Sequence, residues 1–405
     1  PQRVVPPCPY YPDCGGCQLQ HLSYEGQLAW KQKNIQEQLT RIGNLEISEL
    51  VLPIIAADTI WHYRNKAILP VGGTTDNPRI GFYRRNSHEI INGTHCLIQH
   101  TAVEIIRLFV RSLIQAKNIQ AYNEKEHKGL LRSYVVRISE AAKEVSLTLI
   151  LNTTPEEGES YAARWRENFQ QLGQTLERNA YVLTGTALNF NTKRVNVIFG
   201  KESITVTGNP KIKDIINEKE YILSPASFFQ VNSAQAAKLY SVVRDFVTES
   251  LASIDHNQDL TILDIYCGVG SIAIQLADLA PNILGIEINQ AAVADADINA
   301  RLNNCENCRF VAGKAEDWIQ NNLDSTVKIA VVDPPRKGLD PKLIEALNDA
   351  EHLRSLIYVS CNPATLARDI SALISNWNIQ KIQPIDLFPH TTHVECVTLM
   401  SRVKD

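Results

Sequence analysis

One cysteine of the chain stands where a thiol can act as a nucleophile. Cys361 lies between the apolar stretch 356–360, which is typical of a buried strand, and Pro363, a residue favoured in the first turn of a helix. The positive end of a helix dipole lowers the pKa of a thiol and raises its thiolate fraction. A cysteine taken alone is more often buried and inert, so the residues around it have to support a chemical role.

Two carboxylates could work beside this thiol. Asp333 opens the turn 333–336, in which two prolines stiffen the backbone and hold the preceding carboxylate in one direction. Glu395 lies among apolar residues just before a final strand, where it is either a buried general base or a structural hydrogen-bond acceptor.

A glycine-rich turn forms a candidate crevice for a nucleoside cofactor. The stretch 264–270 lies between a strand and a helix, and its glycines let a ligand approach the backbone closely. Glu287 ends the next strand, where a carboxylate can accept hydrogen bonds from ribose hydroxyls; a solvated strand end is the alternative. NAD and S-adenosylmethionine both fit this pattern.

The turn at 333–336 adds one restriction. Turns of the type D/N-P-P are common in methyltransferases that act on planar nitrogen groups of bases. Those enzymes usually place an aromatic residue where Arg336 stands. The departure argues against methylation of an amino group.

Four cysteines of the front half could hold a metal centre. Three of them form a compact C-x5-C-G-G-C loop and one is distant: Cys8, Cys14, Cys17 and Cys96. Four thiolates suit either zinc or a cubane iron–sulfur cluster, and spacing alone does not separate the two. The spacing differs from the C-x3-C-x2-C motif of radical S-adenosylmethionine enzymes. Cys305 and Cys308 form a pair without partners, which we interpret as incidental.

The front half is predicted to contain one helix and then an α+β domain. Apolar residues recur at helical spacing from 23 to 41, and Gly43 is expected as the C-cap. Residues 50–220 combine helical segments at about 100–116 and 158–172 with short β-rich stretches, which predicts an antiparallel sheet. The β-rich stretches are 134–138, 145–150 and 195–198.

From about residue 221 onward, strands and helices alternate. Strands are expected at 261–265, 283–286, 329–332 and 356–360, each followed by a helix. This alternation predicts an α/β fold with a doubly wound, mostly parallel sheet. We expect one domain from 1–22 and 52–218, and a second from 23–51 and 219–405, with the helix at 23–43 packed on the second.

The composition agrees with a cytoplasmic protein. The 405 residues are 44% hydrophobic and 21% charged, and no apolar run reaches the roughly 18–20 residues of a membrane helix. The first residues lack the regions of a secretory signal, and nine cysteines suit a reducing cytosol better than a disulfide scaffold. We expect a monomer that does not associate with a membrane.

Five stretches together resemble the RNA 5-methyluridine methyltransferases. They run in order over about 170 residues: Ser227–Asn232, Asp264–Gly270, Asp333–Arg336, Tyr358–Pro363 and His390–Glu395. The resemblance implies a Rossmann-like, S-adenosylmethionine-dependent methyltransferase domain that modifies C5 of uridine in RNA. It makes Cys361 the nucleophile and Glu395 the base. It also implies that the cofactor contacts Gln230, Tyr266, Glu287 and Asp333.

Uridine chemistry explains these residue types. A thiolate that adds to C6 converts uracil into an enolate whose C5 can take a methyl group. A base must then remove the C5 proton so that the cysteine is released, and the target base must leave its stack. Asp333 could hold the uracil edge or position Cys361. We interpret His390 and His393 as structural or RNA-facing.

The resemblance also concerns the metal and the RNA. Many members of the family carry a [4Fe-4S] cluster on four such cysteines, which favours iron–sulfur over zinc, and these mostly modify 23S ribosomal RNA. Residues 1–218 carry 25 Lys and Arg against 21 Asp and Glu, a net +4, whereas 219–405 carry a net −8. Cations mix with aromatic residues at 61–66 and 82–85, which suits RNA contact.

Four alternatives remain open. The enzyme could act on transfer RNA, on another RNA position or on DNA cytosine. It could also be a non-catalytic RNA-binding iron–sulfur protein, although the presence of both Cys361 and Glu395 speaks against that reading.

Overall fold

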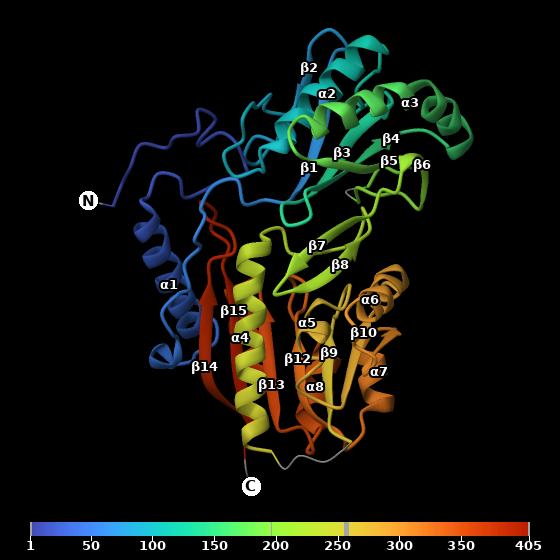
Figure 1. Ribbon diagram of the computed structural model, residues 1–405. Helices are drawn as coiled ribbons and strands as arrows, with labels where there is room; N and C mark the ends of the chain where they lie inside the picture. Colours follow the sequence, from blue (N-terminus) through green and yellow to red (C-terminus); the bar gives the residue numbers. More distant parts are fainter. Residues whose placement is uncertain (1, 196, 255–258, 404–405) are drawn as a thin grey trace.

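A seven-stranded sheet forms the lower part of the molecule (Figure 1). The computed structural model describes residues 2–195, 197–254 and 259–403. The sheet has the order β11-β10-β9-β12-β13-β15-β14. Its strands are β9 (Thr261–Ile265), β10 (Asn282–Glu287), β11 (Cys308–Ala312), β12 (Val327–Val332), β13 (Ser355–Ser360), β14 (Trp377–Ile385) and β15 (Glu395–Arg402). Strands β9 to β13 are parallel and β15 is antiparallel to both of its neighbours, which confirms the predicted mostly parallel sheet.

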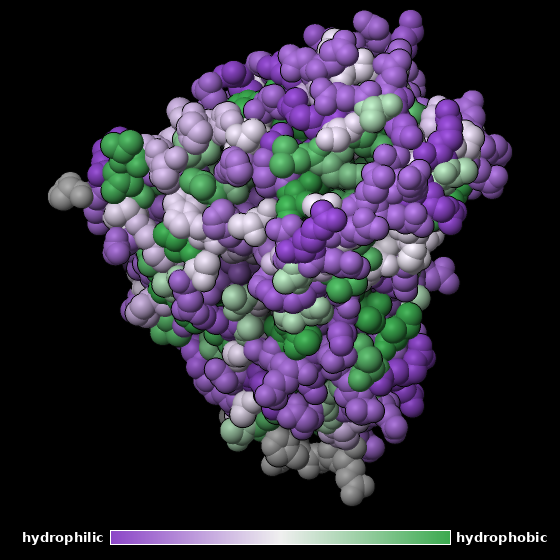
Figure 2. Space-filling model, turned by 45° about the horizontal axis from the view of Figure 1, so that its top comes forward, coloured by the Kyte–Doolittle hydropathy of each residue, from purple (hydrophilic) through white to green (hydrophobic). Residues whose placement is uncertain are grey.

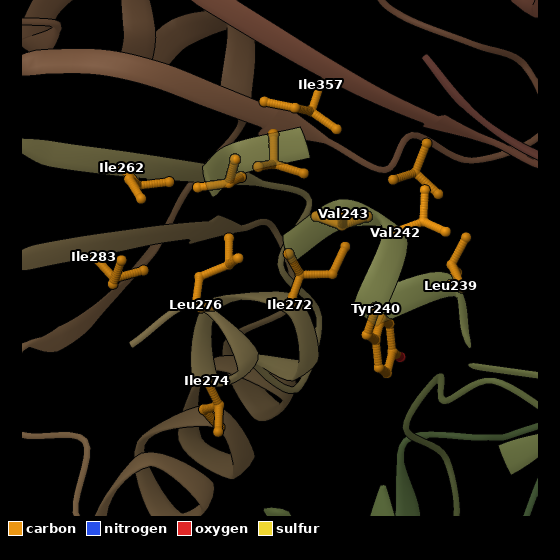
Figure 3. Close-up of a cluster of buried hydrophobic side chains, with 14 of the residues drawn as sticks. Leu239, Tyr240, Val242, Val243, Ile262, Ile272, Ile274, Leu276, Ile283 and Ile357 are labelled. Atoms are coloured by element: carbon orange, nitrogen blue, oxygen red, sulfur yellow. The ribbon is translucent and has the colours of Figure 1, made fainter. Parts of the chain in front are cut away.

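Helices cover both faces of this sheet. They are α4 (Ser233–Ala252), α5 (Ser271–Gln275), α6 (Gln290–Leu302), α7 (Ala315–Asn322), α8 (Pro341–Asp349) and α9 (Pro363–Leu373). Figure 3 shows one of the two clusters that result, in which Ile262 and Ile357 of the sheet gather with Val243 of α4. Because both faces are buried, the parallel strands are almost continuously apolar, and this made them recognisable in the sequence.

The predicted first helix is α1 (Tyr24–Arg41). The Ser23 hydroxyl caps it by accepting a hydrogen bond from the Gly26 backbone N–H. Its residues Ile35 and Leu39 belong to the hydrophobic cluster on the second face of the seven-stranded sheet. The helix ends at Ile42 rather than at Gly43, and Asn44 takes the left-handed conformation that was expected of the glycine.

A six-stranded sheet forms the upper part of the molecule in Figure 1, in the order β2-β1-β3-β4-β5-β6. Its strands are β1 (Lys66–Gly73), β2 (Pro78–Ile80), β3 (Leu131–Ser139), β4 (Glu144–Leu151), β5 (Val182–Phe190) and β6 (Glu202–Gly208). The helices α2 (Ala102–Ala116) and α3 (Pro155–Glu177) share its core. The expected strand at 195–198 includes Asn196, which lies outside the described residues; the described members of that stretch form no strand.

The prediction of a purely antiparallel sheet was wrong for one pair of strands. Strands β4 and β5 are parallel, because α3 carries the chain back across the sheet between them. All other neighbours in this sheet are antiparallel.

A hairpin of β7 (Ile212–Ile216) and β8 (Lys219–Leu223) lies between the two sheets (Figure 1). The Asp214 carboxylate of this hairpin accepts hydrogen bonds from Ser139 of β3 and Ser233 of α4, both at 2.8 Å. The hairpin thus connects the two sheets through buried polar groups. A 3₁₀ helix (Ser48–Leu50) follows α1. The division into the two expected domains stays a prediction.

The face shown in Figure 2 is mostly hydrophilic, with separate apolar patches. In the described ranges, no helix combines the length and the apolar character needed to cross a membrane.

A buried ion pair fixes α1 to the loop before β15. The Lys31 ammonium lies 2.6 Å from the Asp386 carboxylate, and both side chains are fully inaccessible to solvent. Lys31 also donates to the Phe388 carbonyl oxygen, and the Tyr24 hydroxyl donates to the second Asp386 oxygen. The loop that leads to Glu395 is therefore held from α1.

We predict that Lys31→Met destabilises the protein by about 3–5 kcal/mol, because it leaves the Asp386 charge buried without its partner. Urea unfolding measures this change. Lys33→Met is the matched control: Lys33 pairs with Glu37 on the exposed side of the same helix at 3.8 Å, and its loss should cost less than about 0.5 kcal/mol. Equal effects of the two variants would contradict the prediction.

Candidate active site

Strand register brings the predicted nucleophile and base to one edge of the sheet. Ser360 at the end of β13 pairs with Cys396 of the antiparallel β15, so the next residue, Cys361, stands across from Glu395. Asp333 follows β12, whose last residue is paired with β13 two residues before Ser360. These side chains influence one another electrostatically: the Glu395 and Asp333 carboxylates both raise the pKa of Cys361.

The predicted lowering of the pKa of Cys361 was wrong for the unliganded protein. Asn362 does cap α9, and its amide oxygen accepts the Ala364 N–H. Burial nevertheless raises the pKa of the Cys361 thiol to about 11, and the carboxylates of Glu395 and Asp333 add to this effect. The Arg336 guanidinium offsets only part of it. Desolvation and two anions outweigh the helix terminus here.

The two acids are themselves held toward the protonated form. Burial and the neighbouring Asp333 raise the pKa of Glu395 to about 8. Burial raises the pKa of Asp333 to about 7. A glutamate with a pKa near neutrality can exchange a proton at physiological pH, which is what a general base requires.

Three of the four residues expected at the cofactor line one cavity. Gln230, Tyr266 and Asp333 border about 360 Å³ of empty space at the carboxyl ends of β9 and β12. Tyr266 adopts a left-handed backbone conformation with φ of 67°. The Asp333 carboxylate has no hydrogen-bond partner in the described part of the chain. The cavity therefore offers an unpaired acceptor to a ligand.

Glu287 lies beside this cavity but does not line it. Its carboxylate accepts hydrogen bonds from the backbone N–H groups of Gly268, at 3.2 Å, and Asn289, at 2.7 Å. In this state it holds the glycine turn to the start of α6. A ribose would have to compete with these two bonds.

Sequence reasoning did not single out the side chain of Asp264, which contacts the helix that follows the glycine turn. One carboxylate oxygen accepts the Ala273 N–H at 2.9 Å and the other is buried without a partner. Burial raises the pKa of Asp264 to about 8. Its place at the end of an apolar strand, like that of Glu287, was the signal available in the sequence.

A wide groove runs from the glycine loop 15–16 to the same edge of the sheet. It encloses about 1740 Å³ and is lined by Gln230, by aromatic residues and by four arginines: Arg64, Arg84, Arg85 and Arg336. None of the described residues that line it is acidic. The basic clusters at 61–66 and 82–85 each contribute to this groove.

The two histidines of the last motif differ in their surroundings. His390 is buried and stacks on Trp61 with ring centroids 3.6 Å apart, so it is structural. His393 lies 3.1 Å from the Arg336 guanidinium and lines the groove. Arg336 is a second residue whose place in the site sequence reasoning missed, although it closes the turn that Asp333 opens.

The four front cysteines gather in one region, and all four are free thiols. Burial raises the pKa of Cys17 to about 12, and Cys14 and Cys96 contribute to the shift. Cys8 acts in the same way on Cys14 and Cys96. Within the described ranges, however, no three or more Cys, His, Asp or Glu side chains form a group that could hold a metal ion. The expected iron–sulfur centre is therefore not shown.

The sheet order and the crevice at its carboxyl edge are those of a Rossmann-like methyltransferase. More specifically, the chain belongs to the tRNA (uracil-5-)-methyltransferase family, whose sequence profile matches residues 23–403.

Known proteins similar to this chain agree with that assignment. An uncharacterized RNA methyltransferase of Bacillus cereus is 39% identical over 409 aligned residues, which cover 100% of this chain and 84% of the relative. An uncharacterized RNA methyltransferase of Clostridium acetobutylicum is 37% identical, with 99% and 84% covered. The structure of Pyrococcus abyssi tRNA (uracil-54, C5)-methyltransferase in complex with S-adenosyl-L-homocysteine superposes with a TM-score of 0.74, at 28% identity over 96% of this chain and 86% of that one.

We predict that iodoacetamide modifies Cys361 ever faster as pH rises from 7 to 10, by about tenfold per unit, because the thiolate is minor below a pKa of about 11. Glu395→Gln should accelerate the reaction above pH 8, where the native carboxylate is charged, and change it little at pH 6. Mass spectrometry of the Cys361 peptide measures the rate.

The exposed Glu345→Gln of α8 is the control and should leave the profile unchanged. A plateau in the rate below pH 8 would show that the thiol ionises far more easily than its surroundings imply.

Proposed function

We propose that this protein transfers a methyl group from S-adenosylmethionine to C5 of a uridine in RNA. One observation carries the proposal: the register of β13 against β15 sets Cys361 across from a buried Glu395, beside the crevice that Asp333 lines. Membership of the uracil-5-methyltransferase family supports the same reaction.

The cofactor fits the crevice by the chemistry of its lining. Gln230, Tyr266 and Asp333 would hold S-adenosylmethionine, and Glu287 could exchange its backbone partners for ribose hydroxyls. When bound, the cofactor supplies an electrophilic methyl group. The related P. abyssi enzyme contains the product form of this cofactor.

The residues of the chain account for the remaining steps. The Cys361 sulfur forms a bond to C6 of uracil, and the ring becomes an enolate that is nucleophilic at C5. After C5 has taken the methyl group, Glu395 removes the C5 proton and the sulfur–C6 bond breaks. Arg336 lowers the pKa of both Cys361 and Glu395, so it favours the ionised form that each step requires.

The groove provides the RNA-binding surface. Its four arginines and the absence of acidic groups among its described lining residues suit a phosphate backbone, and Phe82, Tyr83 and Phe228 offer rings on which bases can stack. Gln230 lines both groove and crevice, so RNA and cofactor would meet there.

We propose 23S ribosomal RNA as the substrate, since the four front cysteines resemble those of family members that modify this RNA. Transfer RNA is the second candidate, favoured by the similarity to the P. abyssi enzyme. We expect the enzyme to act as a monomer.

We also propose that Cys8, Cys14, Cys17 and Cys96 bind a [4Fe-4S] cluster. The thiols influence one another electrostatically, none is in a disulfide, and three of them, Cys8, Cys14 and Cys96, border one cavity. A buried set of thiols is costly as separate thiolates, whereas a cluster would share their charge.

We predict that an RNA containing 5-fluorouridine at the target position forms a covalent adduct with the wild-type protein in the presence of S-adenosylmethionine. The reason is that C5 then carries fluorine in place of the proton that the base must remove, so the cysteine is not released. Cys361→Ala should form no adduct, and Glu395→Gln should accumulate adduct even with ordinary RNA. Denaturing gel electrophoresis detects the adduct. Cys305→Ala, which replaces a buried cysteine away from this edge, is the control.

Mapping 5-methyluridine in the total RNA of a strain that lacks the gene identifies the natural substrate. We expect one 5-methyluridine to be missing from 23S rRNA. If it is missing only from tRNA, tRNA is the substrate instead. An adduct in Cys361→Ala would exclude the proposed nucleophile.

We predict that protein purified without oxygen contains equal amounts of iron and acid-labile sulfide and absorbs broadly in the visible range, and that Cys96→Ser loses most of both. The reason is that one missing thiolate opens the four-ligand site. Cys308→Ser is the control, and metal analysis is the measurement. Stoichiometric zinc, or no metal, would contradict the proposal.

A further inference from the structure

We infer that the solvent-facing side of α1 binds an unpaired nucleotide next to the target uridine, with Trp30 as the surface on which its base stacks. The inference rests on the proposed function, because it adds a subsite to the same RNA-binding region.

Cys361, the proposed nucleophile, lines a cavity to which α1 also contributes residues. Trp30, Asn34 and Gln38 line one wall of a cavity of about 260 Å³, and Cys361, Arg336 and His393 contribute to the rest. The three α1 residues are four apart, so they form one stripe along the helix. Ligand pockets usually measure roughly 300–1,000 Å³ and hold ligands much larger than a pyrimidine ring. The cavity therefore has room for the target base, and the exposed Trp30 ring in its wall is available to a neighbouring base.

The chemistry of this wall suits a nucleobase. The Trp30 side chain is 38% exposed and stacks on no other ring in the described part of the chain. Gln38 donates an amide hydrogen bond to Asn34 at 3.4 Å, while the remaining donor and acceptor of this pair have no partner among the described residues. Proteins recognise unpaired RNA bases by stacking them on aromatic rings and bonding their edges with such groups.

Charge indicates a polyanion rather than an apolar partner. The cavity adjoins the groove, because Arg336 and His393 line both. No acidic residue appears among the described residues that line either space, although the whole chain has a net charge of −4. An RNA strand in the groove could thus continue past Cys361 onto α1.

The helix that forms this wall is fixed to the protein core by its opposite side. The opposite side of α1 is buried through Lys31, Ile35 and Leu39, and the Ser371 hydroxyl holds the Gly43 carbonyl at its end. Because the helix is already held in place, stacking of a base on Trp30 would cost little conformational entropy of the protein. More of the stacking energy would then contribute to affinity than on a flexible segment.

The experiment compares methylation kinetics of Trp30→Ala, Trp30→Phe and Thr40→Ala on in vitro transcripts of 23S rRNA domains and whole tRNAs. Loss of one stacking surface weakens RNA binding by roughly 5- to 100-fold. We expect Trp30→Ala to raise KM for the transcript about tenfold while kcat and KM for S-adenosylmethionine stay near the wild-type values. Trp30→Phe, which keeps a ring, should recover most of the loss.

Thr40→Ala alters an exposed residue of the same helix outside the cavity and should behave as wild type. An unchanged KM for the transcript in Trp30→Ala would overturn the inference and leave the proposed function intact. So would an equal rise in both KM values, which indicates a general distortion. A wild-type protein that methylates none of the transcripts would instead contradict the proposed function, on which this subsite depends.

Discussion

The antiparallel pairing of β15 with β13 is the constraint on which the site depends. Cys361 and Glu395 are far apart in the chain, and only this register sets them across from each other. A slip of one residue would turn every side chain of β15 to the opposite face. The buried Lys31–Asp386 pair protects the register from outside the sheet, because it fixes the loop that delivers the chain to Glu395.

Three carboxyl groups at the same edge of the sheet have pKa values that burial raises toward neutral pH. Glu395, Asp333 and Asp264 each have a pKa raised to between about 7 and 8, chiefly by desolvation. Full negative charges on Glu395 and Asp333, the two acids that act on Cys361, would oppose its ionisation strongly. Partial protonation of these acids, together with Arg336, lessens that opposition. The reactivity of the Cys361 thiol thus depends on the charges of Glu395, Asp333 and Arg336.

The six-stranded sheet also helps to hold the loop that borders the crevice proposed for the cofactor. The Asn65 side-chain amide donates to the Gln230 carbonyl at 3.1 Å, and the Lys66 ammonium donates to the Ser227 carbonyl at 3.4 Å. On the other side, Asp295 of α6 accepts the Ser227 hydroxyl at 2.7 Å. The loop that carries Gln230 is therefore held by elements of both halves of the molecule, and Gln230 borders both the groove and the crevice.

Local order in the sequence was enough to locate β9, β10, β12 and β13 of the seven-stranded sheet, α1, and the residues at the strand ends, because buried parallel strands and amphipathic helices have short-range signatures. It did not locate β11 or β14. Gln230, Tyr266 and Asp333 were placed at the cofactor on the strength of family resemblance, and the roles assigned to them stay predictions. Tertiary structure alone decided the rest. Long-range pairing made β4 and β5 parallel and set Cys361 across from Glu395, and desolvation raised the thiol pKa that a helix terminus was expected to lower. The sequence contained Trp30 on the polar side of α1, but only the packed fold turned that side toward the nucleophile.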